Sequence, residues 1–187
     1  LFGMEERKLI DKYRQATRCK HFILSVTLTG TQGKTDYPMV EICVNKNTLY
    51  RDKIVETQTL DLNVQDMSVH HTLSIELVDK TPDDTLVVDG EIIKDKSIKI
   101  EKIYIDEVDI KSYVFQGKQI PVYHYKDQGP EMIRGEHLFF PGPWELYYQN
   151  PPRLYFANWS GHSQLINSPA KQKTKNDYLT KIKNLMV

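Results

Sequence analysis

Acidic residues that could bind a cation are concentrated between His71 and Ile110, in or next to turns that separate apolar segments. Ca²⁺ binds about six to eight oxygen atoms, mostly from carboxylates and backbone carbonyls, and loops often supply them. The alternative is that these aspartates only shape turns, because their side chains accept hydrogen bonds from nearby backbone amides. The EF-hand spacing is absent, and we favour the turn interpretation. The candidate calcium ligands are Asp79, Asp83, Asp84 and Asp95.

A second candidate site is the aromatic cluster between Phe139 and Trp159. Exposed tryptophan and tyrosine rings can stack on sugars or on single-stranded bases. The same residue types are enriched in subunit interfaces, and they can equally form the core. All three alternatives stay open. The residues that could form an interface or a glycan platform are Trp144, Tyr147, Tyr148, Tyr155 and Trp159.

The sequence contains no catalytic constellation, and we therefore predict that the protein is not an enzyme. His70 and His71 are adjacent, so in a strand their side chains point to opposite faces. No histidine has the spacing of a zinc site, and no nucleophile elbow, phosphate-binding loop or dinucleotide fingerprint is present. The segment GTQGKT, at residues 30–35, lies between two predicted strands, so we interpret it as a hairpin loop.

Composition narrows the class of partner. The chain has 187 residues, enough for one domain with a full core, and its formal net charge is zero. A nucleic-acid-binding protein carries a basic excess, so no nucleic-acid partner is expected. No apolar run approaches the roughly 18 residues that span a membrane, and the charged start does not resemble a signal peptide. We expect Cys19 and Cys43 to be free thiols.

Strict alternation of apolar and polar residues predicts a mainly β protein. Phe22, Leu24, Val26 and Leu28 share one face of a predicted strand, and Ile98–Ile105 repeats the pattern. Six to eight short strands at regular spacing predict a jelly-roll-like antiparallel β-sandwich. The predicted divisions are an N-terminal helix or arm at 1–20, the sandwich at 21–112, a proline- and aromatic-rich arm at 113–170 and a C-terminal helix at 171–187. We expect the arm to be extended and partly paired as strands near Trp144 to Tyr148 and near Leu154 to Phe156.

Part of the predicted sandwich resembles the calcium-dependent, xylan-binding type of carbohydrate-binding module. The matching elements are Gly30, Pro38 to Asn45, the central strand HTLSIEL at His71 to Leu77, and Ile100 to Asp106. The resemblance implies a small jelly-roll sandwich that binds a host-surface or other polysaccharide glycan with the help of Ca²⁺. It would place acidic calcium ligands at Asp79 and Asp95.

A longer stretch, about residues 24 to 160, resembles small virion-associated proteins of T4-like and marine tailed bacteriophages. The blocks that carry it are TLTGTQGKTDYPMVEICVN, VETQTLDLNV and the segment from His71 to Ile110. This resemblance implies a structural subunit of the tail, neck or capsid surface. It would assemble with other virion proteins after synthesis in the host cytoplasm. A virion subunit is therefore our first functional hypothesis, and a carbohydrate-binding module is the alternative.

Overall fold

The computed structural model describes residues 4–5, 8, 21–119, 135–152 and 155–156. The predicted C-terminal helix, Cys19 and Trp159 lie outside these residues, as does most of the predicted N-terminal helix. No helix in the described part of the chain has the length and apolarity needed to cross a membrane. The strands are β1 (Phe22–Thr31), β2 (Met39–Val44), β3 (Asn47–Lys53), β4 (Glu56–Val64), β5 (His70–Leu77), β6 (Leu86–Val88), β7 (Glu91–Lys94), β8 (Ser97–Ile105), β9 (Val108–Asp109), β10 (Lys118–Gln119), β11 (His137–Leu138) and β12 (Pro143–Gln149), with 3₁₀ helices η1 (Pro82–Asp84) and η2 (Lys111–Gln116).

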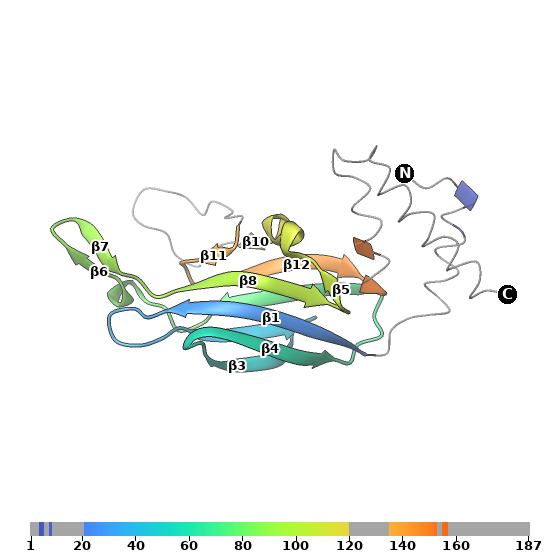
Figure 1. Cartoon of the computed structure of the whole chain (residues 1–187), viewed down its shortest axis with the longest axis horizontal. Coiled ribbons are helices and arrows are strands. Elements are labelled where there is room, and N and C mark those ends of the chain that lie inside the picture. Colours follow the sequence, from blue (N-terminus) through green and yellow to red (C-terminus); the bar gives the residue numbers. More distant parts are fainter. Residues whose placement is uncertain (1–3, 6–7, 9–20, 120–134, 153–154, 157–187) are drawn as a thin grey trace.

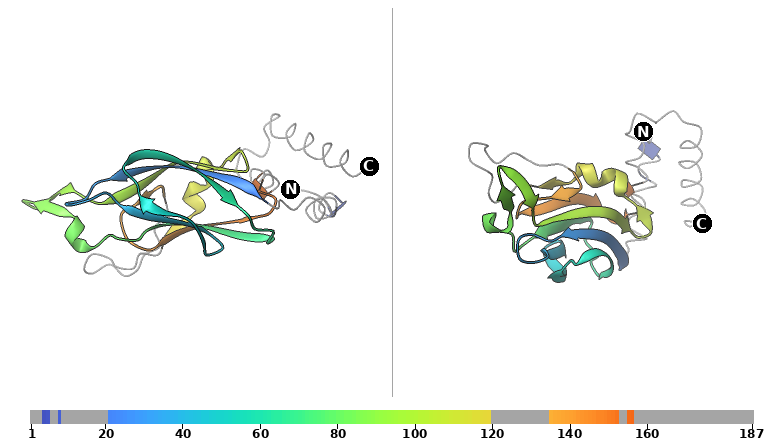
Figure 2. Two further views of the ribbon diagram at one scale, coloured as in Figure 1. Left: turned by 90° about the horizontal axis from the view of Figure 1, so that it is seen from below. Right: turned by 60° about the vertical axis from the view of Figure 1, so that its left-hand side comes forward.

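Two antiparallel sheets are stacked in the molecule (Figures 1 and 2). One has the strand order β11-β8-β1-β4 with β9 beside β8, and the other has the order β10-β12-β5-β2-β3. Strands β6 and β7 form a separate hairpin that extends beyond the sheets at one end of the long axis (Figure 1). The predicted fold class, a mainly antiparallel β-sandwich, is confirmed.

Alternation along β1, β5 and β12 places their apolar residues between the two sheets. In β1 every second side chain from Phe22 to Leu28 is buried, as predicted. On the opposite face, threonine hydroxyls of β1 and β4 form cross-strand hydrogen bonds of 2.9 Å, Thr27 with Thr59 and Thr29 with Thr57. Such pairs stabilise the outer face of a sheet without apolar burial.

The sandwich extends well past residue 112, where the sequence predicted that a separate arm begins. β12 pairs antiparallel with β5 along its whole length, from Pro143 opposite Glu76 to Gln149 opposite His70. The prolines permit this pairing because Pro143 is the first residue of the strand, where a missing N–H is tolerated. β12 therefore belongs to the core of the domain rather than to an extension.

A buried histidine lies in the aromatic part of the core. The ring of His71 stacks on Phe22 at 5.6 Å between centroids and meets Tyr148 edge-on at 5.1 Å. The side chain is fully buried, with Nε2 3.8 Å from the Asp66 carboxylate. Neither ring nitrogen has a hydrogen-bond partner among the described residues. Burial lowers the pKa of His71 below its usual value of 6.5, and Asp66 only partly offsets this effect.

Acidification is expected to destabilise the fold through His71. In the folded chain the lowered pKa favours the neutral imidazole, whereas in the unfolded chain the group binds a proton near its ordinary pKa. As the pH falls from about 7 to about 5, the unfolded state gains the proton first and the free energy of unfolding decreases. Thermal unfolding at both pH values should show a smaller loss for His71→Phe than for the parent chain. Equal losses would contradict this assignment.

Candidate functional site

A small cavity lies between η2, the end of β12 and the chain that follows it. Its volume is about 190 Å³. The lining supplies aromatic rings, one leucine and one amide, with no carboxylate or ammonium group. The lining residues are Tyr113, Gln116, Leu146, Tyr147, Tyr155 and Phe156.

The pocket lies where β12 continues beyond the end of its neighbour β10. The pairing between them ends at Glu145, and among the described residues no strand pairs with 146–149 on that side. Aromatic side chains fill this edge instead. Tyr113 on η2 lies 5.2 Å from the ring of Phe156 and donates a 3.2 Å hydrogen bond to its carbonyl oxygen. η2 is thereby joined to the chain after β12, and the two form the walls of the pocket.

Tyr147 is the exposed aromatic residue of the pocket. It lies on the outer face of β12 and is 46% exposed. Its hydroxyl contacts Nδ1 of His70 and accepts a 3.1 Å hydrogen bond from Nε2 of Gln149. The ring of Tyr155 meets it edge-on at 6.2 Å. These contacts hold the ring in one orientation, so little side-chain entropy would be lost when a ligand stacks on it.

The aromatic residues that the sequence analysis grouped together fall into two groups in the structure, those that line the pocket and those that are buried in the core. Tyr147 and Tyr155 line the pocket, whereas Trp144 and Tyr148 are fully buried in the core and offer no platform. Trp159 lies outside the described residues. Tyr113 and Gln116 were missed because nothing in the sequence shows that η2 packs beside β12.

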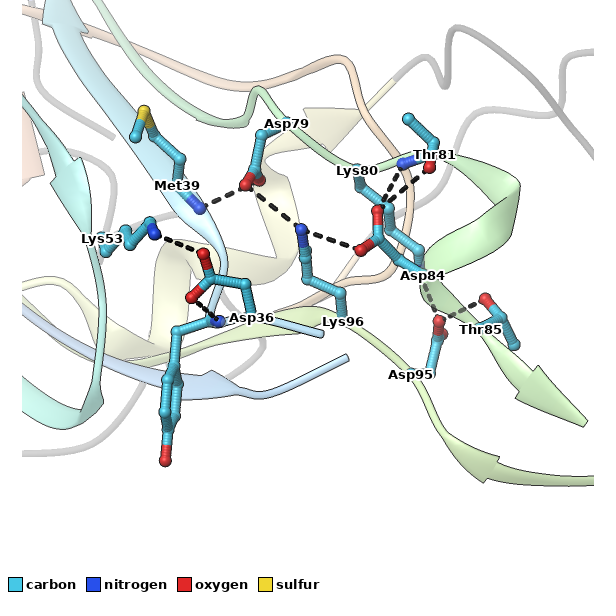
Figure 3. A network of polar contacts seen from close by, with 11 residues as sticks. Asp36, Met39, Lys53, Asp79, Lys80, Thr81, Asp84, Thr85, Asp95 and Lys96 are labelled. Carbon is cyan, nitrogen blue, oxygen red and sulfur yellow. Dashed lines mark hydrogen bonds and ion pairs between the residues drawn. The ribbon is translucent and has the colours of Figure 1, made fainter. Parts of the chain in front are cut away.

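A cluster of charged side chains lies at the other end of the sandwich, near the base of the β6–β7 hairpin (Figure 3). Its first centre is the ammonium of Lys96, which is 2.9 Å from the Asp84 carboxylate and 3.2 Å from that of Asp79. The Lys96 side chain is only 5% exposed. Burial alone would lower the pKa of Lys96, but the hydrogen bonds to Asp84 and Asp79 outweigh it and raise that pKa above its usual value.

The second centre of the cluster is Lys80. Its ammonium lies 2.6 Å from the Asp95 carboxylate and 5.8 Å from the centre of the Phe140 ring. The same carboxylate oxygen accepts a 2.6 Å hydrogen bond from the hydroxyl of Thr85. The Lys80 side chain is 2% exposed. Burial lowers the pKa of Lys80, and the carboxylate of Asp95 offsets only part of that effect.

Three of the four candidate calcium ligands belong to this cluster, and each contacts a lysine. Asp83 is exposed on η1. Within the described residues, no three His, Cys, Asp or Glu side chains converge in a way that could hold a metal ion. The structure therefore brings Asp79, Asp84 and Asp95 together, but around ammonium groups.

Comparison with known proteins yields a similarity of fold only. No family model matches the sequence, and no curated protein matches it. One similar solved structure is vCBM60 in complex with galactobiose, with a TM-score of 0.47 and 12% identity over 68% of this chain and 98% of that chain. Another is the selenomethionine form of vCBM60, described with two families of calcium-dependent carbohydrate-binding modules. It has a TM-score of 0.46 and 12% identity over 69% of this chain and 91% of that one. Similarity of this degree assigns neither a family nor a ligand.

Proposed function

We propose that this chain is a non-catalytic binding module that holds a neutral saccharide in the aromatic pocket beside Tyr147. The observation that carries the proposal is the half-exposed side chain of Tyr147, combined with uncharged hydrogen-bonding groups in one cavity. A sugar ring presents an apolar C–H face and a rim of hydroxyls, so it needs both kinds of surface. Pockets for small ligands have this composition, with mostly apolar walls and a few fixed polar groups.

The dimensions of the pocket favour one ring of a longer chain. Its volume of about 190 Å³ is below the roughly 300–1,000 Å³ of pockets that enclose drug-sized ligands. Neighbouring rings of an oligosaccharide would then lie along the open side of the cavity. The sequence resemblance to carbohydrate-binding modules supports the same class of ligand.

Replacement of Tyr147 by alanine tests the proposal. The full chain is first applied to an array of xylan, galactan and glucan oligosaccharides, and its best ligand is then titrated by calorimetry. Tyr147→Ala should weaken binding about fivefold or more, since a stacked ring contributes about 1–3 kcal/mol in the comparable recognition of nucleic-acid bases. Phe139→Ala is the matched control, because Phe139 is 42% exposed but does not line the pocket.

Two results would refute saccharide binding in this pocket. One is the absence of any ligand on the array for a folded chain. The other is equal affinity of Tyr147→Ala, Phe139→Ala and the parent chain for the ligand that is found.

A second candidate function, assembly with other proteins, is favoured by the β6–β7 hairpin. Val87, Val88, Ile92 and Ile93 are each between 47% and 59% exposed on this hairpin. Apolar surface of this kind often marks a contact with another protein. A role in a tailed-phage virion stays a prediction from the sequence. Light scattering of the concentrated chain checks the capacity to self-assemble, and a strict monomer would oppose it.

A further inference from the structure

The charged cluster places two buried ammonium groups where a bound cation would lie. Lysine is rarely buried unless it is paired, yet the side chains of Lys80 and Lys96 are 2% and 5% exposed. Each contacts at least one carboxylate at 3.2 Å or less. A metal ion could bind here only if these carboxylates had oxygen atoms that accept no other contact.

Both oxygens of two of the carboxylates already accept hydrogen bonds. One oxygen of the Asp84 carboxylate contacts the Lys96 ammonium. The other oxygen accepts hydrogen bonds from the backbone N–H and the hydroxyl of Thr81. One oxygen of the Asp79 carboxylate accepts a hydrogen bond from the Lys96 ammonium. The other accepts a 2.9 Å hydrogen bond from the backbone N–H of Met39. A cation that entered here would displace the Lys96 ammonium and leave it buried without a partner, which is strongly unfavourable.

The cluster also joins segments of the chain that are distant in sequence. Lys80 follows β5 and Lys96 precedes β8, so their ion pairs connect the two ends of the segment that carries the β6–β7 hairpin. The loop between β1 and β2 is connected to the same cluster by a 2.9 Å hydrogen bond from the backbone N–H of Lys34 to the carbonyl oxygen of Asp84. Figure 3 shows these segments meeting around the two lysines.

We infer that Lys80 and Lys96 supply from within the chain the positive charge that holds this end of the sandwich together. Asp79, Asp84 and Asp95 are then not a calcium site, and this cluster requires no divalent cation. This differs from what the sequence resemblance to calcium-dependent modules implies. It is independent of the proposed saccharide pocket, which lies at the other end of the sandwich.

The first test uses the full-length parent chain. Thermal unfolding with millimolar CaCl₂ and with EDTA should give melting temperatures equal within about 1 °C, because a ligand stabilises only a state that binds it. Calorimetric titration with CaCl₂ should show no saturable heat. A saturable calcium isotherm, or a melting temperature several degrees higher with calcium, would overturn the inference whatever the behaviour of the variants.

The second test compares two lysines that each lie 2.9 Å from a carboxylate. Lys96 is buried beside Asp84, whereas Lys99 is 36% exposed beside Glu101. Lys96→Met should lower the melting temperature by roughly 10 °C, and Lys99→Met by no more than about 2 °C. Adding Asp84→Asn to Lys96→Met should recover part of the loss, because it removes the carboxylate left without its ammonium. Equal effects of the two lysine variants, or no recovery, would overturn the role of Lys96.

Discussion

Truncation of Trp144 to alanine is expected to destabilise the sandwich by about 3–5 kcal/mol. The indole is fully buried, and it is among the largest buried side chains in the described residues. Tyr147 lies on the opposite face of the same strand, β12, and is 46% exposed. Tyr147→Ala should therefore cost much less stability than Trp144→Ala, although it removes an aromatic ring from the same strand.

Urea unfolding of the two variants measures this difference. The midpoint should fall strongly for Trp144→Ala and only slightly for Tyr147→Ala, with the dependence on urea concentration unchanged. Comparable losses for the two variants would contradict the assignment of Trp144 to the core and of Tyr147 to the ligand pocket.

A single added methyl group at Gly117 is expected to cost about 3 kcal/mol or more. A Cβ atom at this position would lie 2.0 Å from Cε2, 2.1 Å from Cζ2 and 2.3 Å from Nε1 of Trp144. The backbone φ of Gly117 is −62°, which alanine adopts without strain, so the effect is purely steric. The indole cannot move away easily, because it is enclosed by the core.

The clash at Gly117 can be separated from other effects by shrinking its partner. Gly117→Ala should cost far less in a Trp144→Leu background, since the shorter side chain leaves room for the methyl group. Thermal unfolding of both single variants and the double variant gives the coupling energy. Additive losses would show that Gly117 does not pack against the indole.

Local patterning predicted those parts of the fold that depend on single strands. The alternation in β1 identified its buried face, from Phe22 to Leu28, because a strand in a two-layer sandwich packs only one of its faces against the other sheet. The conformation of a tight turn also depends on adjacent residues. Asp89 and Gly90 both have positive φ, the geometry of the tight hairpin turn that an Asp-Gly pair favours.

The position of β12 was not predicted because strand pairing across a long loop leaves no local signal. The prolines of residues 113–170 suggested an arm, although within β12 the only proline is Pro143, its first residue. One usable signal was present. In PWELYYQ, Trp144, Leu146 and Tyr148 alternate with Glu145 and Tyr147, which separates core from surface.

The cluster around Lys80 and Lys96 could not have been found from sequence. Lysines next to aspartates in turns are ordinary surface residues, and only the three-dimensional meeting of three segments buries these two. The same limit applies to the pocket, where His70 and Tyr147 meet only because β5 and β12 pair. Sites formed by residues distant in sequence require the pairing of strands to be known first.

The most direct test of the saccharide pocket is NMR mapping of a bound oligosaccharide on the isotope-labelled full chain. The best array ligand is titrated, and chemical-shift changes are assigned to residues. Binding in the pocket predicts changes in the side-chain amides of Gln116 and Gln149 and the backbone of Tyr147, with Lys80 and Lys96 unaffected. Changes centred on the lysine cluster or on the β6–β7 hairpin, with none at Tyr147, would contradict it.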